Sequence, residues 1–262
     1  MTTSTTPAKP EKPHPLRRLA RWWGALVWLL LWQLGAMALN QKILLVSPVQ
    51  VAARLWQLLP QGEFWSAVGF SFLRITLGFL LACVVGTALG VLASRFRVVR
   101  DLCAPLMATV KSIPVASFII LALILFSSRN LAVLISFLIV LPVLYTNILG
   151  GIRAADLQLL EMARVFRIPA ARRIRYVYLP QVLPYFRSAC DSALGLCWKS
   201  GIAAEVIGMP DGSIGEQLQQ AKIYLNTPDL FAWTLVIVLV SLVFEKVFLA
   251  LLKWGEHALE RM

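Results

Sequence analysis

The stretch AADLQLLEMARVFRIPAARRIRYVYLP, residues 154–180, decides how the chain is arranged across a membrane. It separates two long apolar segments, and seven arginines fall between positions 153 and 187. Arginine at this density is typical of the cytoplasmic loops of membrane proteins. Asp156 is a suitable N-cap for a helix, and the residues behind it share one helical face: Leu157, Leu160 and Arg164. The sequence therefore predicts a short, structured loop that a membrane protein holds in the cytoplasm.

The composition places most of the remaining chain in the membrane. Of the 262 residues, 59% are hydrophobic, and the mean hydropathy is +0.75. These values are too apolar for a soluble domain and are typical of an integral membrane protein. The four cysteines form no CxxC pair, so we interpret them as small apolar packing residues rather than as a redox or metal site.

The net charge of +12 does not indicate a nucleic-acid partner, because the lysines and arginines are distributed unequally between the two predicted sides of the membrane. Of the 25 lysines and arginines, seventeen fall on one predicted side of the membrane and four on the other. This asymmetry follows the positive-inside rule and places both termini in the cytoplasm. Some of these basic residues can also contact anionic headgroups of the lipid bilayer.

The apolar segments predict an all-α integral membrane protein with six transmembrane helices: 22–39, 67–93, 102–126, 131–150, 184–207 and 230–252. In this interpretation residues 22–252 form one transmembrane domain. Residues 1–21, rich in Thr, Pro and Lys, should be a disordered cytoplasmic tail, and residues 253–262 a cytoplasmic C-terminal tail. Small residues around position 37 resemble a signal-peptidase site, but the long, Trp-rich first segment favours a retained helix.

Three further local patterns refine this arrangement. Ser47 and Pro48 predict the N-cap and first residue of a short amphipathic helix on the outer interface. Pro105 and Pro114 should bend the third spanning segment. Small residues recur every fourth position in the second segment, at Gly78, Ala82, Gly86 and Gly90. Such a ridge lets a neighbouring helix approach closely, although glycine is also common in membrane helices in general.

The sequence gives little support for an enzyme. It has two histidines, His14 and His257, both near the chain ends. It has no GxxxxGK[ST] motif to bind ATP and no cluster of residues with metal-ligand spacing, so we predict no catalytic residue, no metal and no bound cofactor.

Two charged residues within the fifth spanning segment need an explanation. Lys199 lies in the middle of the segment, where an unpaired lysine is costly. It either lines a solute pathway or forms a salt bridge, for example with Asp191. Glu205 lies near the outer end of the segment, where it either lines the pathway or orders the glycine-rich turn that follows.

The central loop is expected to hold two short helices. The first covers about residues 156–166, and Arg167 and Ile168 then form a corner, because Pro169 disfavours helical geometry in the residue before it. The second helix begins near Pro169, and Leu179-Pro180 ends the loop. An alternative is a basic amphipathic helix resting on anionic lipid. That alternative explains the arginines but not the run Glu161-Met162-Ala163, whose small alanine could admit a close-packed partner.

At this loop the chain resembles the permease subunits of bacterial ABC importers that depend on a binding protein. Their cytoplasmic motif is Glu-Ala-Ala, three residues, Gly, nine residues, Ile, any residue and Leu-Pro. Here Glu161, Met162 and Ala163 are followed at the same spacing by Arg167 and by Val177-Tyr178-Leu179-Pro180. Arg167 departs from the motif, in which glycine eases the turn between the two helices. A non-glycine residue with positive φ costs roughly 1 kcal/mol, so either the corner avoids that conformation or Pro169 helps to enforce it.

The resemblance covers about residues 45–250, and several shorter runs are similar to the nitrate, sulfonate and taurine branch of the family. These runs are Ser47-Pro48, Leu73-Arg74-Ile75, Ser112-Ile113-Pro114, and Ala204-Glu205 followed by Ser213-Ile214-Gly215. The run Trp198-Lys199-Ser200-Gly201 departs from the expected sulfonate-permease pattern, so the solute class extends to other small organic solutes and anions, including vitamin precursors.

The resemblance implies the type I ABC importer permease fold in a bacterial cytoplasmic (inner) membrane, functional as a homodimer with the solute pathway at its interface. Two ATPase subunits, which carry ATP and Mg²⁺, would dock on the cytoplasmic face. An extracytoplasmic solute-binding protein would dock on the outer face. The residues implied in ATPase coupling are Leu160, Glu161, Met162, Ala163, Arg164, Arg167, Leu179 and Pro180.

A secondary transporter or channel that works without an ATPase is the main alternative. Such a protein would be expected to show an inverted repeat or paired intramembrane acids for ion coupling. The sequence shows neither, so we expect the permease of an ATP-driven importer.

Overall fold

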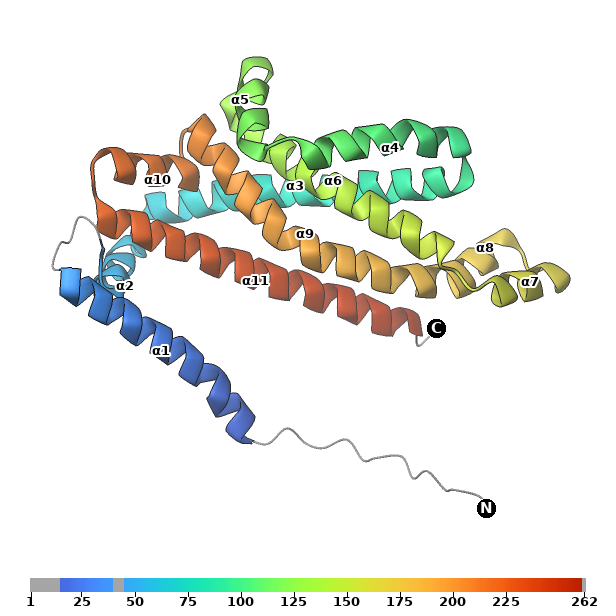
Figure 1. Cartoon of the computed structure of the whole chain (residues 1–262), viewed down its shortest axis with the longest axis horizontal. Coiled ribbons are helices and arrows are strands. Elements are labelled where there is room, and N and C mark those ends of the chain that lie inside the picture. The colour runs from blue at the N-terminus through green and yellow to red at the C-terminus, as the bar shows by residue number, and fades with distance from the viewer. Residues whose placement is uncertain (1–14, 40–44, 261–262) are drawn as a thin grey trace.

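The structure is a computed structural model that describes residues 15–39 and 45–260 (Figure 1). Most of the predicted N-terminal tail, residues 1–14, lies outside the described part of the chain. All regular secondary structure within the described residues is helical. The elements in chain order are α1 (Pro15–Leu39), α2 (Pro48–Leu58), α3 (Gly62–Arg95), α4 (Arg97–Ser112), α5 (Val115–Leu125), α6 (Ser128–Arg153), α7 (Leu157–Val165), α8 (Ala170–Arg173), the π-helix η1 (Ile174–Tyr178), α9 (Leu179–Gly208), α10 (Ile214–Ile223) and α11 (Thr227–Glu260).

The long helices α3, α6, α9 and α11 run roughly alongside one another (Figure 1). Helices α2 and α10 lie at one end. Helices α7 and α8 lie at the other, near the C-terminus. The core between the long helices consists of aliphatic and aromatic side chains from α3, α6, α9 and α11, including Phe79, Leu144, Leu194 and Trp198. An apolar segment of this length is most stable when one face packs on its neighbours and the other faces lipid.

Three helices in the described residues are long and apolar enough to cross a membrane: α3, α6 and α11 as far as Glu256. Helices α4 and α5 form a fourth candidate if they are taken together. The described apolar part of α1, Leu26–Leu39, is shorter. Helix α9 has 30 residues, about 45 Å at 1.5 Å per residue, but it includes four charged side chains. The chain is therefore a multi-pass helical protein.

Helices α3 and α6 approach each other along the ridge of small residues in α3. Ala82 is fully buried there, and the three glycines leave no room for a larger residue. A Cβ atom added to Gly78 would lie 2.5 Å from the carbonyl oxygen of Val133. At Gly86 and Gly90 it would lie 2.7 Å and 2.8 Å from the side chains of Leu144 and Ile148. Successive turns of α3 thus lie directly against the surface of α6.

The third predicted segment is broken rather than merely bent. Helices α4 and α5 meet at Ile113 and Pro114 and are inclined by 108° to each other. Pro114 supplies no backbone N–H and restricts the residue before it to extended geometry, and Ile113 has ψ 129°. Pro105 lies inside α4 without interrupting it. The single spanning segment predicted at 102–126 is therefore two helices, either a broken span or a re-entrant loop.

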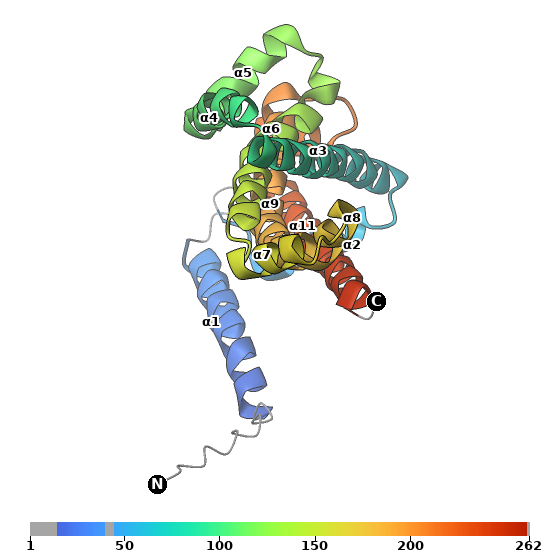
Figure 2. The same ribbon diagram turned by 90° about the vertical axis from the view of Figure 1, so that its right-hand side faces the viewer.

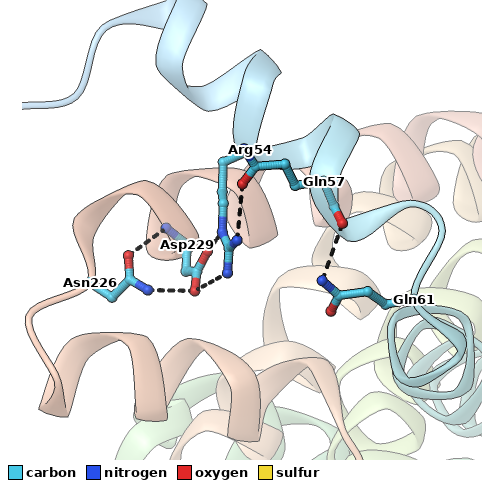
Figure 3. A network of polar contacts seen from close by, with 5 residues as sticks. All are labelled: Arg54, Gln57, Gln61, Asn226 and Asp229. Atoms are coloured by element: carbon cyan, nitrogen blue, oxygen red, sulfur yellow. Dashed lines mark hydrogen bonds and ion pairs between the residues drawn. The ribbon is translucent and has the colours of Figure 1, made fainter.

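The predicted amphipathic helix is α2, and its N-cap is confirmed, because the Ser47 side chain accepts a hydrogen bond from the Gln50 N–H. A network of polar contacts ties α2 to the start of α11 (Figure 3). The Arg54 guanidinium binds both carboxylate oxygens of Asp229, and Asn226 donates to the same carboxylate at 2.6 Å. The hydrogen bond to Asp229 raises the pKa of Arg54. A two-pronged arginine–carboxylate contact fixes direction as well as distance, so α2 is held in one orientation on the bundle.

Three predicted boundaries differ from the structure. Helix α1 begins at Pro15, within the predicted tail, and α11 continues as far as Glu260. Leu179-Pro180 does not end the loop, because α8, η1 and α9 follow one another without a break from Ala170 to Gly208. In η1 the hydrogen bonds take the π register, with the Leu179 N–H donating to the Ile174 carbonyl. The wider π turn lies just before Pro180, where a regular α-helix would clash with the proline ring.

Candidate functional site

Helix α7 projects from one end of the bundle and is well capped at its start. The Asp156 side chain accepts a hydrogen bond from the Gln158 N–H at 2.8 Å, which confirms the predicted N-cap. The α7–α8 segment lies beside the start of α9 and is the part of the bundle end that faces the viewer in Figure 2. A helix of nine residues is too short to be stable alone in water, so contacts with the rest of the chain maintain it.

The corner after α7 is a helix C-cap of the Schellman type, with Arg167 in the left-handed conformation at φ 52°. The Ile168 N–H donates to the Ala163 carbonyl at 2.9 Å, and the Arg167 N–H donates to the Arg164 carbonyl at 3.0 Å. Glycine usually occupies this left-handed position, because it has no Cβ to clash. The chain therefore keeps the turn geometry expected of a glycine and places an arginine in it.

Replacing Arg167 with glycine is expected to stabilise the loop by about 1 kcal/mol, because the left-handed strain disappears while both turn hydrogen bonds remain. Thermal unfolding of the purified protein, followed by tryptophan fluorescence, should show a small rise in Tm. The control is Arg164→Gly, which places glycine in the right-handed last turn of α7 and should lower stability by about 1 kcal/mol. Equal effects of the two substitutions would contradict the assigned corner geometry.

One face of α7 is open to solvent and combines a carboxylate with large apolar groups. Glu161 is exposed. Around it lie Leu157, Met162, Val165 and Phe166, with Phe166 73% and Val165 78% exposed. Apolar side chains gathered at this density on a projecting helix are typical of a protein-binding surface. We call the five residues Leu157, Glu161, Met162, Val165 and Phe166 the α7 face.

The other predicted coupling residues are distributed around this face. Arg164 and Arg167 are exposed, and Leu160 is half-buried. Ala163 is only 1% exposed, so the chain itself covers the small residue that we expected to admit a partner. Val177, in the second half of the loop, is also buried. Leu179 and Pro180 are exposed on the first turn of α9.

We did not predict from the sequence that Leu157, Val165 and Phe166 are exposed at the surface. An apolar residue in a short helix is normally assigned to the core, and the helical spacing alone did not show which face would be covered. The position of Ala163 opposite them was the available signal, because the smallest residue in a short helix often marks its closest packed face.

A hydrogen bond connects the loop to the long helix α9. The backbone N–H of Asp156, just before α7, donates to the Gln181 side chain on α9 at 2.8 Å. Helix α9 continues from there through the middle of the bundle to Gly208 at the opposite end. Helix α9 packs against α6 and α11, so this bond connects the loop to the middle of the bundle.

Glu205 lies at the other end of α9 and is completely buried. It accepts hydrogen bonds from the Ser71 hydroxyl at 2.6 Å and from the Gly215 N–H at 3.4 Å. Gly215 is in the first turn of α10, whose positive dipole end favours a nearby carboxylate. A Cβ on Gly215 would lie 2.3 Å from the Cβ of Glu205. Glu205 thus connects the end of α9 to α3 and to the first turn of α10.

Lys199 has the opposite environment. Its side chain is exposed on α9, and no carboxylate within the described residues lies close enough to form an ion pair with it. Lys199 and Asp191 form no ion pair, so the example that we gave for a salt bridge is not found. The lysine therefore points away from the core of its own subunit.

Comparison with known proteins gives the fold and the loop a context. The sequence model of the binding-protein-dependent transport system inner membrane component matches residues 78–261. The chain is 28% identical over 244 residues to the putative aliphatic sulfonates transport permease protein SsuC of Bacillus subtilis, covering 90% of this chain and 87% of that protein. It is 25% identical to the taurine transport system permease protein TauC of Escherichia coli, with 82% and 80% covered.

Further homologues are named as bicarbonate and nitrate permeases. Among solved structures, an amino acid ABC transporter crystallised with histidines superposes with a TM-score of 0.52 at 20% sequence identity. The match covers 74% of this chain and 94% of the other, and it supports the fold. The family model spans the small-residue ridge of α3 and all the elements from α4 to α11, including the α7 loop. This chain belongs to the family of binding-protein-dependent transport system inner membrane components, the permeases of ABC importers.

Proposed function

We propose that the chain is the transmembrane permease subunit of an ATP-driven importer and that α7 is its coupling helix. The subunit forms the solute pathway, and cytoplasmic ATPase subunits that hold ATP and Mg²⁺ drive it. The observation that carries this proposal is the α7 face: a carboxylate surrounded by exposed apolar groups on a projecting helix, connected by Gln181 to α9. Water and not lipid surrounds a loop beyond the membrane. Exposed apolar groups on such a loop are therefore typical of a surface that a partner protein covers.

In this account α7 occupies a groove on the ATPase, and Glu161 pairs with a basic residue there. Closure of two ATPase subunits on ATP moves both coupling helices, and the rigid connection to α9 transmits the motion into the bundle. Movement of a packed helix by a few ångströms is sufficient to open one side of a pathway and close the other, because packed helices have a few discrete arrangements.

The proposed assembly contains two copies of this chain, each with six spans and both termini in the cytoplasm. Helices α1 and α9, together with the broken α4–α5 segment, supply the spans beyond α3, α6 and α11. The unpaired Lys199 supports a second copy, because an exposed lysine in the middle of a membrane helix is costly in lipid and acceptable in a water-filled pathway. A solute-binding protein would dock at the α2–α10 end.

The solute is proposed to be a small anion or small organic solute, such as a sulfonate, taurine, nitrate or a vitamin precursor. Homologues named for sulfonate, taurine, nitrate and bicarbonate support this class. A positive charge on the pathway at Lys199 suits solutes with a negative group.

The test is reconstitution of the purified permease in liposomes with its ATPase, its binding protein and radiolabelled candidate solutes. Uptake is expected to require ATP inside, the ATPase and the binding protein together. Uptake at the same rate without the ATPase, driven by an ion gradient, would contradict the proposal and favour a secondary transporter.

A further inference from the structure

Two charged residues that have no part in the coupling account lie where three segments of the chain meet. Arg74 is on α3, and Glu205 is near the end of α9. The third segment is the α5–α6 corner, residues 126–130. The end of α9 lies against this corner, since a Cβ added to Gly208 would lie 3.8 Å from the Cβ of Ser128.

Glu205 is a buried carboxylate with one oxygen bonded and the other unused. Its side chain is fully buried. The oxygen Oε2 accepts both hydrogen bonds of the carboxylate, from the Ser71 hydroxyl and from the Gly215 N–H. The oxygen Oε1 is buried and has no hydrogen-bond partner among the described residues. A buried carboxylate oxygen without a donor is unfavourable, so another arrangement of the chain that supplies a donor would be stabilised there.

Arg74 is placed to be that donor. Ser71, which already binds Glu205, lies three residues before Arg74, so the two side chains share one face of α3. The charge of Arg74 also acts electrostatically on Glu205. The two side chains nevertheless form no ion pair in this structure, because the described ion pairs do not include them.

The Arg74 guanidinium instead holds the α5–α6 corner. Its Nη1 donates to the backbone carbonyl of Arg129 and to the side-chain oxygen of Asn130, the latter at 3.2 Å. The guanidinium carbon lies 4.1 Å from the centre of the Phe70 ring. Both acceptors in the corner are neutral, and a hydrogen bond between two charged groups is roughly twice as strong as one between neutral groups. Arg74 therefore binds the weaker acceptors while the carboxylate nearby keeps an unused oxygen.

The α5–α6 corner is also attached in a way that permits movement. Helix α5 follows the break at Ile113 and Pro114, and its buried side chains are Ile119 and Ala122. A break of this kind is a natural hinge, because a few dihedral angles can absorb the change of direction. If the corner moved away from α3, Arg74 would lose both neutral acceptors, and a change of its side-chain rotamers would be enough to seek another.

We propose that Arg74 exchanges partners during transport. It holds the α5–α6 corner in the arrangement seen here, and it pairs with Glu205 Oε1 when the corner moves away. Arg74 and Glu205 are positioning residues in this account, and neither has to touch the solute. The exchange gives this part of the bundle two discrete arrangements, each with its own set of bonds, as a pathway that opens and closes requires. It rests on the proposed role in transport but not on what drives transport.

The experiment compares Arg74→Gln, Glu205→Gln and the double variant in two measurements. In solute uptake by the reconstituted protein, each single substitution is expected to slow the rate about tenfold. The double variant should also be slowed only about tenfold, rather than about a hundredfold, because all three lose the same ion pair. In thermal unfolding of the purified permease, where the two residues are not paired, the decreases in Tm should instead nearly add.

The matched control is Lys222→Gln, which removes an exposed cation from the last turn of α10. It should take up solute as the unmodified protein does, and it should add no loss when combined with Arg74→Gln. Arg74→Lys keeps the charge and should recover part of the uptake that Arg74→Gln loses. If Glu205→Gln does not fold, Glu205→Asp replaces it in the same comparison, since the shorter side chain cannot reach the same position.

Three results would overturn the exchange. Normal uptake by Glu205→Gln would show that a neutral side chain is sufficient and that no ion pair forms. A loss of about a hundredfold in the double variant would show that the two residues act independently. Decreases in Tm that fail to add would show that they are already paired at rest. Uptake by the unmodified protein without an ATPase would contradict the proposed function alone, because the comparison of variants needs only solute movement.

Discussion

Replacing Gly78 with alanine is expected to destabilise the protein by about 3 kcal/mol and to reduce sharply the amount of folded permease in the membrane. The added Cβ would lie 2.5 Å from the Val133 carbonyl oxygen and 2.9 Å from the Cβ of Ser136. The first contact is with backbone, which cannot move aside by a change of side-chain rotamer. Helices α3 and α6 would have to separate along their whole interface, and the core behind them would lose its packing.

The matched control is Gly69→Ala, nine residues earlier on the same helix. No heavy atom lies within 4 Å of a Cβ at that position, so the substitution should be neutral or slightly stabilising. Tm from tryptophan fluorescence and the yield of monodisperse protein measure both variants. If Gly78→Ala and Gly69→Ala behave alike, the close approach of α3 and α6 is wrong.

Replacing Glu161 with lysine is expected to weaken assembly with the ATPase about a hundredfold and to abolish ATP-driven uptake, while the permease itself remains folded. The reason is electrostatic. A reversed charge at the centre of the α7 face would lie against the basic residue proposed to receive the carboxylate. Glu161 is exposed and has no partner within the described residues, so its loss removes no internal contact. Binding is measured by co-purification with the ATPase, and coupling by ATPase stimulation in liposomes.

The control for this charge reversal is Asp211→Lys, in the exposed turn before α10 at the opposite end of the bundle. It changes the net charge by the same amount and should leave ATPase binding intact. Phe166→Ser provides an independent test of the α7 face, since it removes apolar area without changing charge and should also weaken assembly. Full ATPase coupling in Glu161→Lys would refute the assignment of α7.

Several features of this fold were predictable because they depend on neighbouring residues in the chain. Ser47 and Asp156 cap their helices through backbone groups two or three residues away, so a short stretch contains the whole interaction. The bend predicted at Pro114 has the same local origin in the proline ring, although the structure shows a break between two helices there. The α7 loop was identified from arginine density and motif spacing, which are also properties of the sequence alone.

Other features depend on packing between distant segments, and the sequence did not reveal them. The helix continues through Leu179-Pro180, where η1 adopts the π register, and the motif spacing did not predict this. Pro114 predicted a bend but not its size, which is 108° between α4 and α5. Ala163 is buried and Phe166 is exposed, and the helical spacing alone did not show which side of α7 would be covered. Lys199 and Glu205 looked alike as intramembrane charges, and their opposite environments appear only in three dimensions.

The most direct measurement of the central claim uses a single reporter thiol on the α7 face. All four native cysteines are buried, so Met162→Cys, at a position 45% exposed, supplies the one accessible thiol in the described structure. Its reaction with a membrane-impermeant maleimide is followed in inside-out vesicles, with and without the assembled ATPase. The account predicts rapid labelling of the permease alone and strong protection, by tenfold or more, in the complete transporter. Equal labelling rates in the two samples would show that α7 does not dock on the ATPase and would contradict the account.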